Sequence, residues 1–159
     1  EAVIVPSQQE TCFGGYTSLM KYISPKTVIV SDTSTKIHHT SLQKVSREEK
    51  HRLSVKDVDF DIINTQYGLV CVVTCYGKTV IISACSYEAD EITQANIDLL
   101  VTTHAIPVGF NPELSVVVNS DFLMDVEIER LNSKRIISNK SETVVIKFTQ
   151  KGDVKVYAD

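Results

Sequence analysis

The chain has 159 residues, a formal net charge of −4, 43% hydrophobic residues and 23% charged residues. These values are typical of a globular domain and exclude a disordered, collagen-like or low-complexity chain. No apolar run reaches the roughly 18 residues that a membrane-spanning helix needs. The mild acidity also argues against a duplex-binding function, because such domains carry a basic excess.

We expect residues 1–159 to form a single compact domain, or a fragment of a larger protein, with a soft boundary near residues 86–104. No secretory-signal pattern opens the sequence, and four cysteines are too few for a disulfide scaffold. We therefore expect an intracellular, cytoplasmic location. Cys71 and Cys75 lie on one predicted strand, about 13 Å apart and too far for a disulfide. These two and Cys85 are predicted to be reduced core residues.

The first 30 residues predict a strand, a short helix and a second strand. Ala2–Val5 and Thr27–Val30 are apolar on both faces, which is typical of buried parallel strands. Between them, Thr17–Ile23 suits a short helix that Pro25 ends. This order indicates a right-handed βαβ crossover.

Two further elements follow in the first half of the chain. Ser46-Arg47-Glu48-Glu49 is a capping-box pattern and predicts a second helix that extends to about Leu53. Val58, Phe60 and Ile62 then alternate with aspartates, so residues 57–62 are predicted to be a strand with one solvated face.

The strongest local pattern is a central β-hairpin over residues 68–86. Two β-rich runs flank Gly77-Lys78, a Gly-X turn that would place Cys75 opposite Val80. Both faces of the two runs are apolar, so we expect the hairpin at the centre of the core, with Ile82 among the buried side chains.

The second half adds one helix and several strands. Residues 86–103 predict a third helix, with acids near its start and an apolar stripe along one side. Residues 114–118 and 122–128 predict strands, and residues 143–149 and 153–157 predict a closing hairpin. The expected fold class is therefore α+β, with a mainly β core, a βαβ-like start, a central β-hairpin and about three short helices.

Charge is distributed unevenly along the chain. Residues 61–130 hold ten acids and two bases, a balance of −8, whereas residues 131–159 carry a balance of +3. Solvated faces of opposite sign are the common explanation. The sharper hypothesis is that a basic C-terminal hairpin contacts an acidic protein partner or a second copy of the chain. Nucleic acid is not an expected partner, and residues 131–159 are the one segment suited to contact phosphate.

Cys12, His104, Asn119 and Asp121 follow the order of a cysteine-peptidase catalytic set. Cys12 heads the first predicted helix, whose dipole would lower the pKa of the thiol. The order resembles that of papain-like peptidases, in which the cysteine opens a helix and the histidine precedes an apolar strand. Alignment on the helix that follows, however, places the nucleophile at Gly14. The competing interpretation is a loop cysteine and a helix-capping histidine.

Two other groups could hold a metal ion. Asp57, Asp59 and Asp61 place three carboxylates on one strand face, where a solvated face is the commoner outcome. His38 and His39 are adjacent in a polar loop and are either solvated or a terminal pair of metal ligands.

Residues 2–39 resemble the C-terminal half of a metallo-β-lactamase-like fold, of the type attached to bacterial DNA-uptake channels. In that family a strand ends in Pro-His-His-Gly, and a short helix, Pro-Lys, an apolar strand and a Gly-His-Pro loop follow. The counterparts in this sequence are Val3-Ile4-Val5-Pro6, Tyr16–Ile23, Ser24-Pro25-Lys26, Thr27–Ser31 and His38-His39-Thr40-Ser41.

The resemblance implies a degenerate metal site. Ser7-Gln8-Gln9 stands where the family has its histidine pair, and the sequence has no HxHxDH motif. The family resemblance thus implies a metal-free descendant, or half of a domain completed by another chain, and we expect no cofactor. No catalytic set is complete. We therefore favour a non-catalytic binding or assembly module that acts through protein–protein contacts. The alternative is a hydrolase, either papain-like through Cys12 and His104 or metallo-β-lactamase-like with most metal ligands lost.

Overall fold

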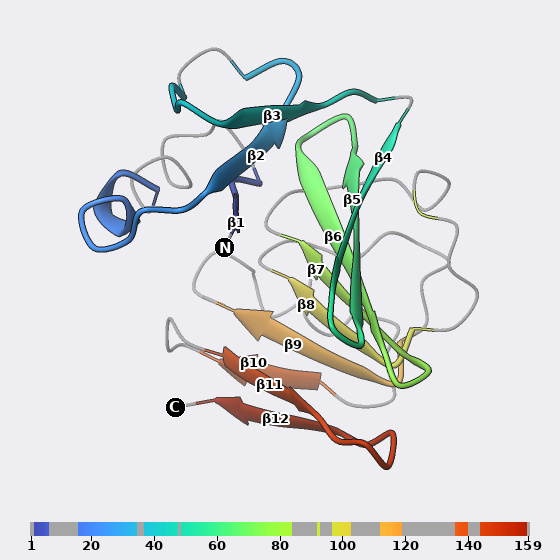
Figure 1. Ribbon diagram of the computed structural model, residues 1–159. Coiled ribbons are helices and arrows are strands. Elements are labelled where there is room, and N and C mark those ends of the chain that lie inside the picture. The colour runs from blue at the N-terminus through green and yellow to red at the C-terminus, as the bar shows by residue number, and fades with distance from the viewer. Residues whose placement is uncertain are drawn as a thin grey trace.

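The computed structural model describes residues 2–6, 16–34, 37–47, 49–83, 92, 97–102, 112–118, 136–139 and 144–158. Twelve strands make up most of these residues, and they form three sheets (Figure 1). Within the described part of the chain, no helix is both long and apolar enough to cross a membrane.

A three-stranded parallel sheet is built from the start of the chain. Strands β1 (Ala2–Ile4), β2 (Thr27–Ser31) and β3 (Leu42–Val45) lie in that order, and both pairings are parallel. A helical turn at residues 16–19 precedes β2. The predicted βαβ-like start is therefore confirmed, since Val3 pairs with Val28 in parallel register.

The seven-stranded sheet has the order β10-β9-β8-β7-β6-β5-β4. Its first three neighbouring pairs are parallel and its last three are antiparallel. The strands are β4 (Lys50–Val55), β5 (Val58–Asn64), β6 (Leu69–Cys75), β7 (Lys78–Ser83), β8 (Leu99–Thr102), β9 (Leu114–Val118) and β10 (Ile136–Asn139).

Both faces of this sheet are covered by apolar side chains. On β6, Leu69, Cys71 and Val73 join one core cluster, whereas Val70 and Val72 join a second cluster on the opposite face. Successive side chains of a strand point to opposite faces, so a strand buried on both sides must be apolar at every position. The first five residues of β6 are all buried, as this constraint requires.

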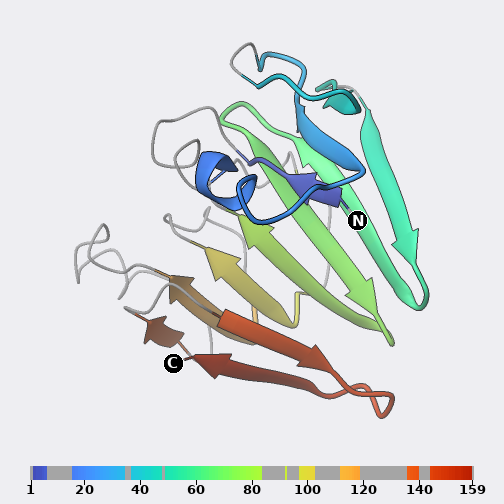
Figure 2. The ribbon, with the colours of Figure 1, turned by 60° about the vertical axis from the view of Figure 1, so that its left-hand side comes forward.

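The first of these clusters joins the three sheets. Ile29 and Val45 bring the β1–β3 sheet onto it, and the hairpin of β11 (Val144–Phe148) and β12 (Val154–Ala158) packs on it through alternate side chains. These hairpin side chains are Ile146, Phe148, Val154 and Val156. Figure 2 shows the β1–β3 segment and the hairpin in front of different parts of the same large sheet.

The expected α+β class with three helices is wrong. The segment from Ser46 was expected to be helical, but β4 occupies Lys50–Val55 and pairs with β5. Leu99–Thr102, expected at the end of the third helix, forms β8 between two parallel neighbours. The four residues of β8 are buried, as a strand between two parallel neighbours requires, whereas β4 is an edge strand with mostly exposed residues. Of the rest of the third predicted helix, residues 92, 97 and 98 are described and are not helical, and the other residues lie outside the described part of the chain, as does the strand predicted at residues 122–128.

The central hairpin is confirmed, but its turn lies one residue earlier than predicted. Cys75 pairs with Lys78 rather than Val80, so Tyr76 and Gly77 form the loop. Their φ angles are 49° and 75°, as a type I′ turn requires. Of the two adjacent isoleucines on β7, Ile81 is 0% exposed and Ile82 is 41% exposed. The expectation of a buried Ile82 is therefore wrong.

Adjacent isoleucines on β7 provide a matched test of this register. Ile81→Ala should lower the free energy of unfolding by about 2–5 kcal/mol, because it leaves a cavity between fully buried side chains. Ile82→Ala should cost about 1 kcal/mol or less, because much of this side chain already meets solvent. Urea titration of both variants measures the difference. Equal losses would contradict the register.

Candidate functional site

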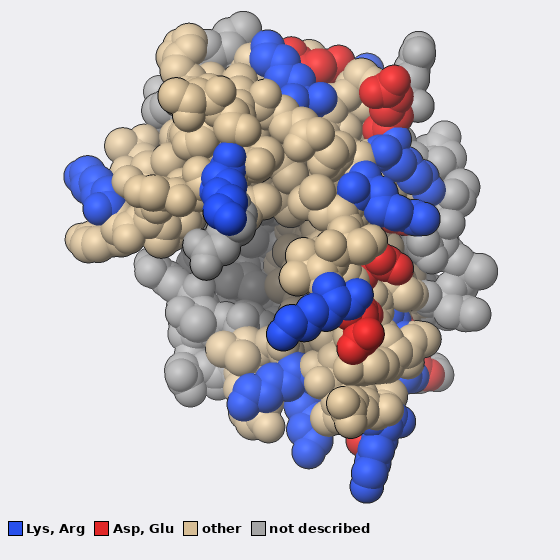
Figure 3. Space-filling model, viewed as in Figure 1, with Lys and Arg blue, Asp and Glu red and all other residues tan. Residues whose placement is uncertain are grey.

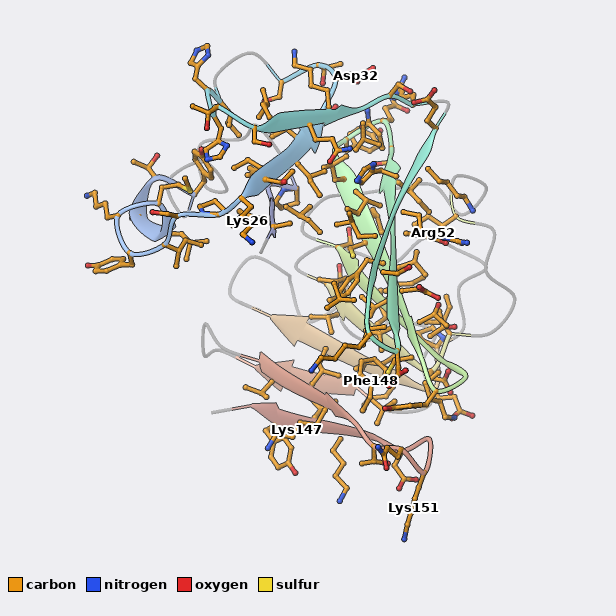
Figure 4. All side chains as sticks on the ribbon, in the orientation of Figure 1. Lys26, Asp32, Arg52, Lys147, Phe148 and Lys151 are labelled. Atoms are coloured by element: carbon orange, nitrogen blue, oxygen red, sulfur yellow. The ribbon has the colours of Figure 1, made fainter. Side chains whose placement is uncertain are left out.

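Polar segments meet where strands of two different sheets end. A pocket of about 640 Å³ lies there, between the turn after β2, the connection between β5 and β6, and the end of β1. Figure 4 shows Asp32 at this position, near the end of β2. Strand ends are where sheet proteins can place polar groups without disturbing a buried core, and ligands commonly bind there.

Asn64 ties the two sheets together at the pocket. It is the last residue of β5, and its side-chain amide donates to Asp32 Oδ1 at 2.9 Å and to the Val45 carbonyl at 2.8 Å. The residue is only 6% exposed. Since a buried amide without partners costs free energy, this pair of bonds fixes the ends of β2 and β3 against β5.

The turn after β2 is held by its own hydrogen bonds. The Ser34 amide donates to the Ser31 carbonyl at 2.9 Å, and the hydroxyls of Ser31 and Thr33 lie 2.9 Å apart. Ser34 lines the pocket and is 3% exposed, yet no described residue forms a hydrogen bond with its Oγ. A buried hydroxyl that lacks a hydrogen bond lowers the free energy of unfolding by about 1–3 kcal/mol, so Ser34 is an unusual feature of the pocket wall.

The opposite wall is the connection between β5 and β6. The Thr65 amide and hydroxyl both donate to the Gly68 carbonyl at 2.8 Å, which closes a tight loop. The Leu69 amide donates to the Pro6 carbonyl at 2.6 Å and joins this loop to the end of β1. The two walls are therefore held independently of any bound molecule.

Two opposite charges line the pocket without pairing. The described residues contain two ion pairs, Arg52–Asp61 and Lys78–Asp98. Neither involves Asp32 or Arg47, although both of these residues line the pocket. Asp32 uses Oδ1 for Asn64 and Ser31, and no described residue bonds to its Oδ2.

Of the predicted catalytic residues and histidine ligands, the structure describes only His38 and His39, and neither lines this pocket. Cys12, His104, Asn119 and Asp121 lie outside the described residues, so the peptidase arrangement stays untested. His38 is exposed, and His39 Nδ1 accepts a hydrogen bond from the Ser41 amide at 3.1 Å. The histidine pair follows Ile37, which does line the pocket, but the pair itself does not. Its role as a metal-ligand pair stays a prediction.

The three aspartates near β5 have ordinary structural partners. Asp61 accepts two hydrogen bonds from Arg52. Hydrogen bonding to Arg52 is the main cause that lowers the pKa of the Asp61 carboxyl group. Asp59 accepts from the Ser54 hydroxyl, and Asp57 accepts from the Tyr76 hydroxyl. Each carboxylate thus has its own partner, as expected for a solvated strand face.

The described cysteines are not suited to nucleophilic chemistry. Cys71 and Cys75 are free and buried, which confirms them as reduced core residues. Burial, assisted by the negative charge of Asp61, raises the pKa of the Cys71 thiol to about 11. A thiol with such a pKa stays protonated near neutral pH and reacts slowly.

Comparison with known proteins shows the fold. No protein-family model matches the chain, and no curated protein matches its sequence. Among solved structures, the chain is similar to the metallo-β-lactamase fold protein YhfI from Bacillus subtilis, with a TM-score of 0.58 and 14% sequence identity. The match covers 98% of this chain and 77% of that chain. The chain therefore has a fold distantly similar to that of metallo-β-lactamases.

The pocket residues do not fit the zinc ions that the fold name implies. Zinc sites are built from several histidine, cysteine or carboxylate ligands. The described residues contain no group of three or more such side chains that could hold a metal ion. Of the side chains known to line the pocket, only Asp32 is a zinc ligand type. The pocket chemistry is that of hydroxyl, amide and guanidinium groups, which bind organic polar ligands.

Sequence reasoning did not select the pocket residues. Asp32, Thr33 and Ser34 directly follow the apolar run of β2, and Asn64 and Thr65 directly follow β5. Polar residues immediately after a buried strand are the signal that could have been used. To predict that Asn64 faces Asp32, one would have to know how distant segments of the chain pair, and the sequence alone does not provide this.

Asn64→Ala tests the junction between the sheets. The change removes two donors from buried surroundings, so it should lower the free energy of unfolding by about 1–3 kcal/mol. Ser54→Ala is the control, because it removes an exposed hydrogen bond to Asp59 and should cost roughly 0.5 kcal/mol or less. Denaturant titration measures both. A loss for Asn64→Ala no greater than the control would contradict a clamping role.

Proposed function

We propose that this chain is a non-catalytic binding module with a metallo-β-lactamase-like fold. The observation that carries the proposal is the chemistry of the pocket, whose known lining residues offer binding groups but no metal-ligand set. The motif order of residues 2–39 further supports a relationship to the domains attached to DNA-uptake channels. A hydrolase with most of its metal ligands lost is the alternative that the experiments below distinguish.

The C-terminal hairpin is the contact surface that we propose for a protein partner. Its inner face packs on the core, so the surface that remains for a partner is its outer face. Its outer face carries Val145 and Tyr157, which are 44% and 49% exposed, together with Lys147 and Lys155. Figure 3 shows basic side chains projecting from the lower part of the molecule, where the hairpin lies.

The cross-strand pairing favours an acidic partner. Lys147 lies directly opposite Lys155, and like charges at such positions are destabilising. The Lys147 ammonium lies 5.0 Å from the centre of the Tyr157 ring, a contact that holds it over the hairpin face. An acidic partner surface would offset the repulsion, while Val145 and Tyr157 would supply apolar contact.

The module hypothesis predicts that purified protein carries no stoichiometric zinc. The physical reason is the lack of a complete ligand set among the described residues. Elemental analysis after dialysis against buffer containing zinc provides the measurement, and hydrolysis of bis-p-nitrophenyl phosphate provides a second readout. One zinc per chain that disappears in a variant with His38→Ala and His39→Ala would contradict the hypothesis and favour the hydrolase.

The double variant Lys147→Glu, Lys155→Glu tests the contact surface. It keeps a like-charged cross-strand pair, so the hairpin should stay folded while binding to an acidic surface is lost. Sedimentation at low and high salt measures self-association, and titration with poly-glutamate measures binding to an acidic chain. We expect wild-type association to weaken with salt and to fall about tenfold in the variant.

A matched control carries the same change of charge on the β1–β3 side of the molecule. Lys26 and Lys44 are exposed there, and Figure 4 places Lys26 far from Lys147. The variant Lys26→Glu, Lys44→Glu should retain association. Equal loss of binding in both variants would show that total charge alone governs binding. A wild-type protein that stays monomeric and does not bind poly-glutamate would refute the contact surface.

A further inference from the structure

The pocket contains two opposite charges that are separated rather than paired. Asp32 lies in the turn after β2, and Arg47 follows β3 by two residues. Both line the same space, but no ion pair forms between them. Opposite charges in one pocket attract a ligand that carries the complementary pair, an ammonium for Asp32 and a carboxylate for Arg47.

Ser34 supplies an independent indication of a ligand. Ser34 lines the pocket, its hydroxyl oxygen is buried, and no described residue forms a hydrogen bond with it. Buried hydroxyls are normally hydrogen-bonded, so an unpartnered one in a pocket wall marks a place where a ligand group or water completes the bond. A peptide amide can donate to or accept from this oxygen.

The remaining wall is apolar and the space is large enough for more than one amino acid. Val5, Val30 and Ile37 are buried and line the pocket beside the polar groups. A volume of about 640 Å³ falls within the range of small-molecule sites. An apolar wall beside two separated charges suits a compound with charged ends and hydrocarbon side chains between them.

We propose that this pocket binds a small zwitterionic ligand of dipeptide size, with its ammonium group on Asp32, its carboxylate on Arg47 and its central amide at Ser34. Asn64 holds Asp32 from one side through Oδ1, which leaves Oδ2 for the ammonium group. The tight loop closed by Thr65 and Gly68 keeps the opposite wall in place before the ligand arrives, so little ordering is needed on binding.

Leucyl-leucine and its blocked analogues test the proposal by isothermal titration calorimetry. The free dipeptide should bind roughly tenfold or more tightly than N-acetyl-leucyl-leucine and than leucyl-leucine amide, because each blocked form lacks one charged end. Asp32→Asn should remove the discrimination against the acetylated form alone. Arg47→Gln should remove the discrimination against the amide alone. Ser34→Ala should weaken all of the peptides by a similar factor.

Two control variants carry the same chemical changes away from the pocket. Asp57→Asn lies beyond the opposite end of β5, and Lys151→Gln lies at the tip of the C-terminal hairpin (Figure 4). Both should bind all peptides as the wild type does. We expect Asp32→Asn to stay folded, since the asparagine keeps an oxygen that can accept from Asn64. Circular dichroism and thermal unfolding check this expectation. Where that variant unfolds, the pair of blocked peptides still tests the charges on wild-type protein.

Equal binding of leucyl-leucine and its two blocked forms would overturn the proposal, and so would the absence of leucyl-leucine binding at a concentration of about 10 mM. Discrimination against the acetylated form that persists in Asp32→Asn, or against the amide in Arg47→Gln, would also overturn it. The pocket and the C-terminal hairpin consist of different residues, so failure here leaves the results of the zinc and poly-glutamate experiments unaffected.

Discussion

The burial of β6 on both faces is the constraint on which the rest of the structure depends. Val70 and Val72 are 0% and 1% exposed and face one cluster, while Leu69, Cys71 and Val73 face the other. A single apolar layer cannot cover both sides of a sheet. The chain therefore supplies the β1–β3 sheet and the β11–β12 hairpin to one face, and Ile92 and Ile97 to the opposite face. The number of layers follows from the composition of these central strands.

This arrangement leaves the strand ends as the place for polar chemistry. Between layers, an unpaired amide or hydroxyl would be desolvated, whereas at the end of a strand it can meet a partner from the next sheet. Asn64 shows the solution, because it lies at the last position of a buried strand and bonds to the ends of two strands in the other sheet. The pocket lies beside it, lined by the ends of strands from the two sheets.

The sequence predicted strands where apolar runs were unambiguous and failed where a local pattern competed with sheet pairing. Residues 27–30 and 69–75 were found because their apolar composition alone excludes a solvated element, and residues 144–148 were found because they are rich in β-branched residues. The capping box at Ser46 was misleading, because the pairing of Leu53 with Phe60 and of Arg52 with Asp61 stabilises a strand instead. β3 and β10 were not predicted, since each forms a strand by pairing in parallel with a segment that is distant in the sequence. The pocket was missed for the same reason.

The junction between the sheets is held by hydrogen bonds among the described residues. Metal ligands in a protein do two things at once, because they hold strand ends together and they supply a Lewis acid. The amide of Asn64 performs the first task by hydrogen bonds alone, and the Leu69–Pro6 bond adds a second link between the sheets. Neither link supplies an electrophile. A pocket held in this way keeps its shape and its polar lining without a bound molecule.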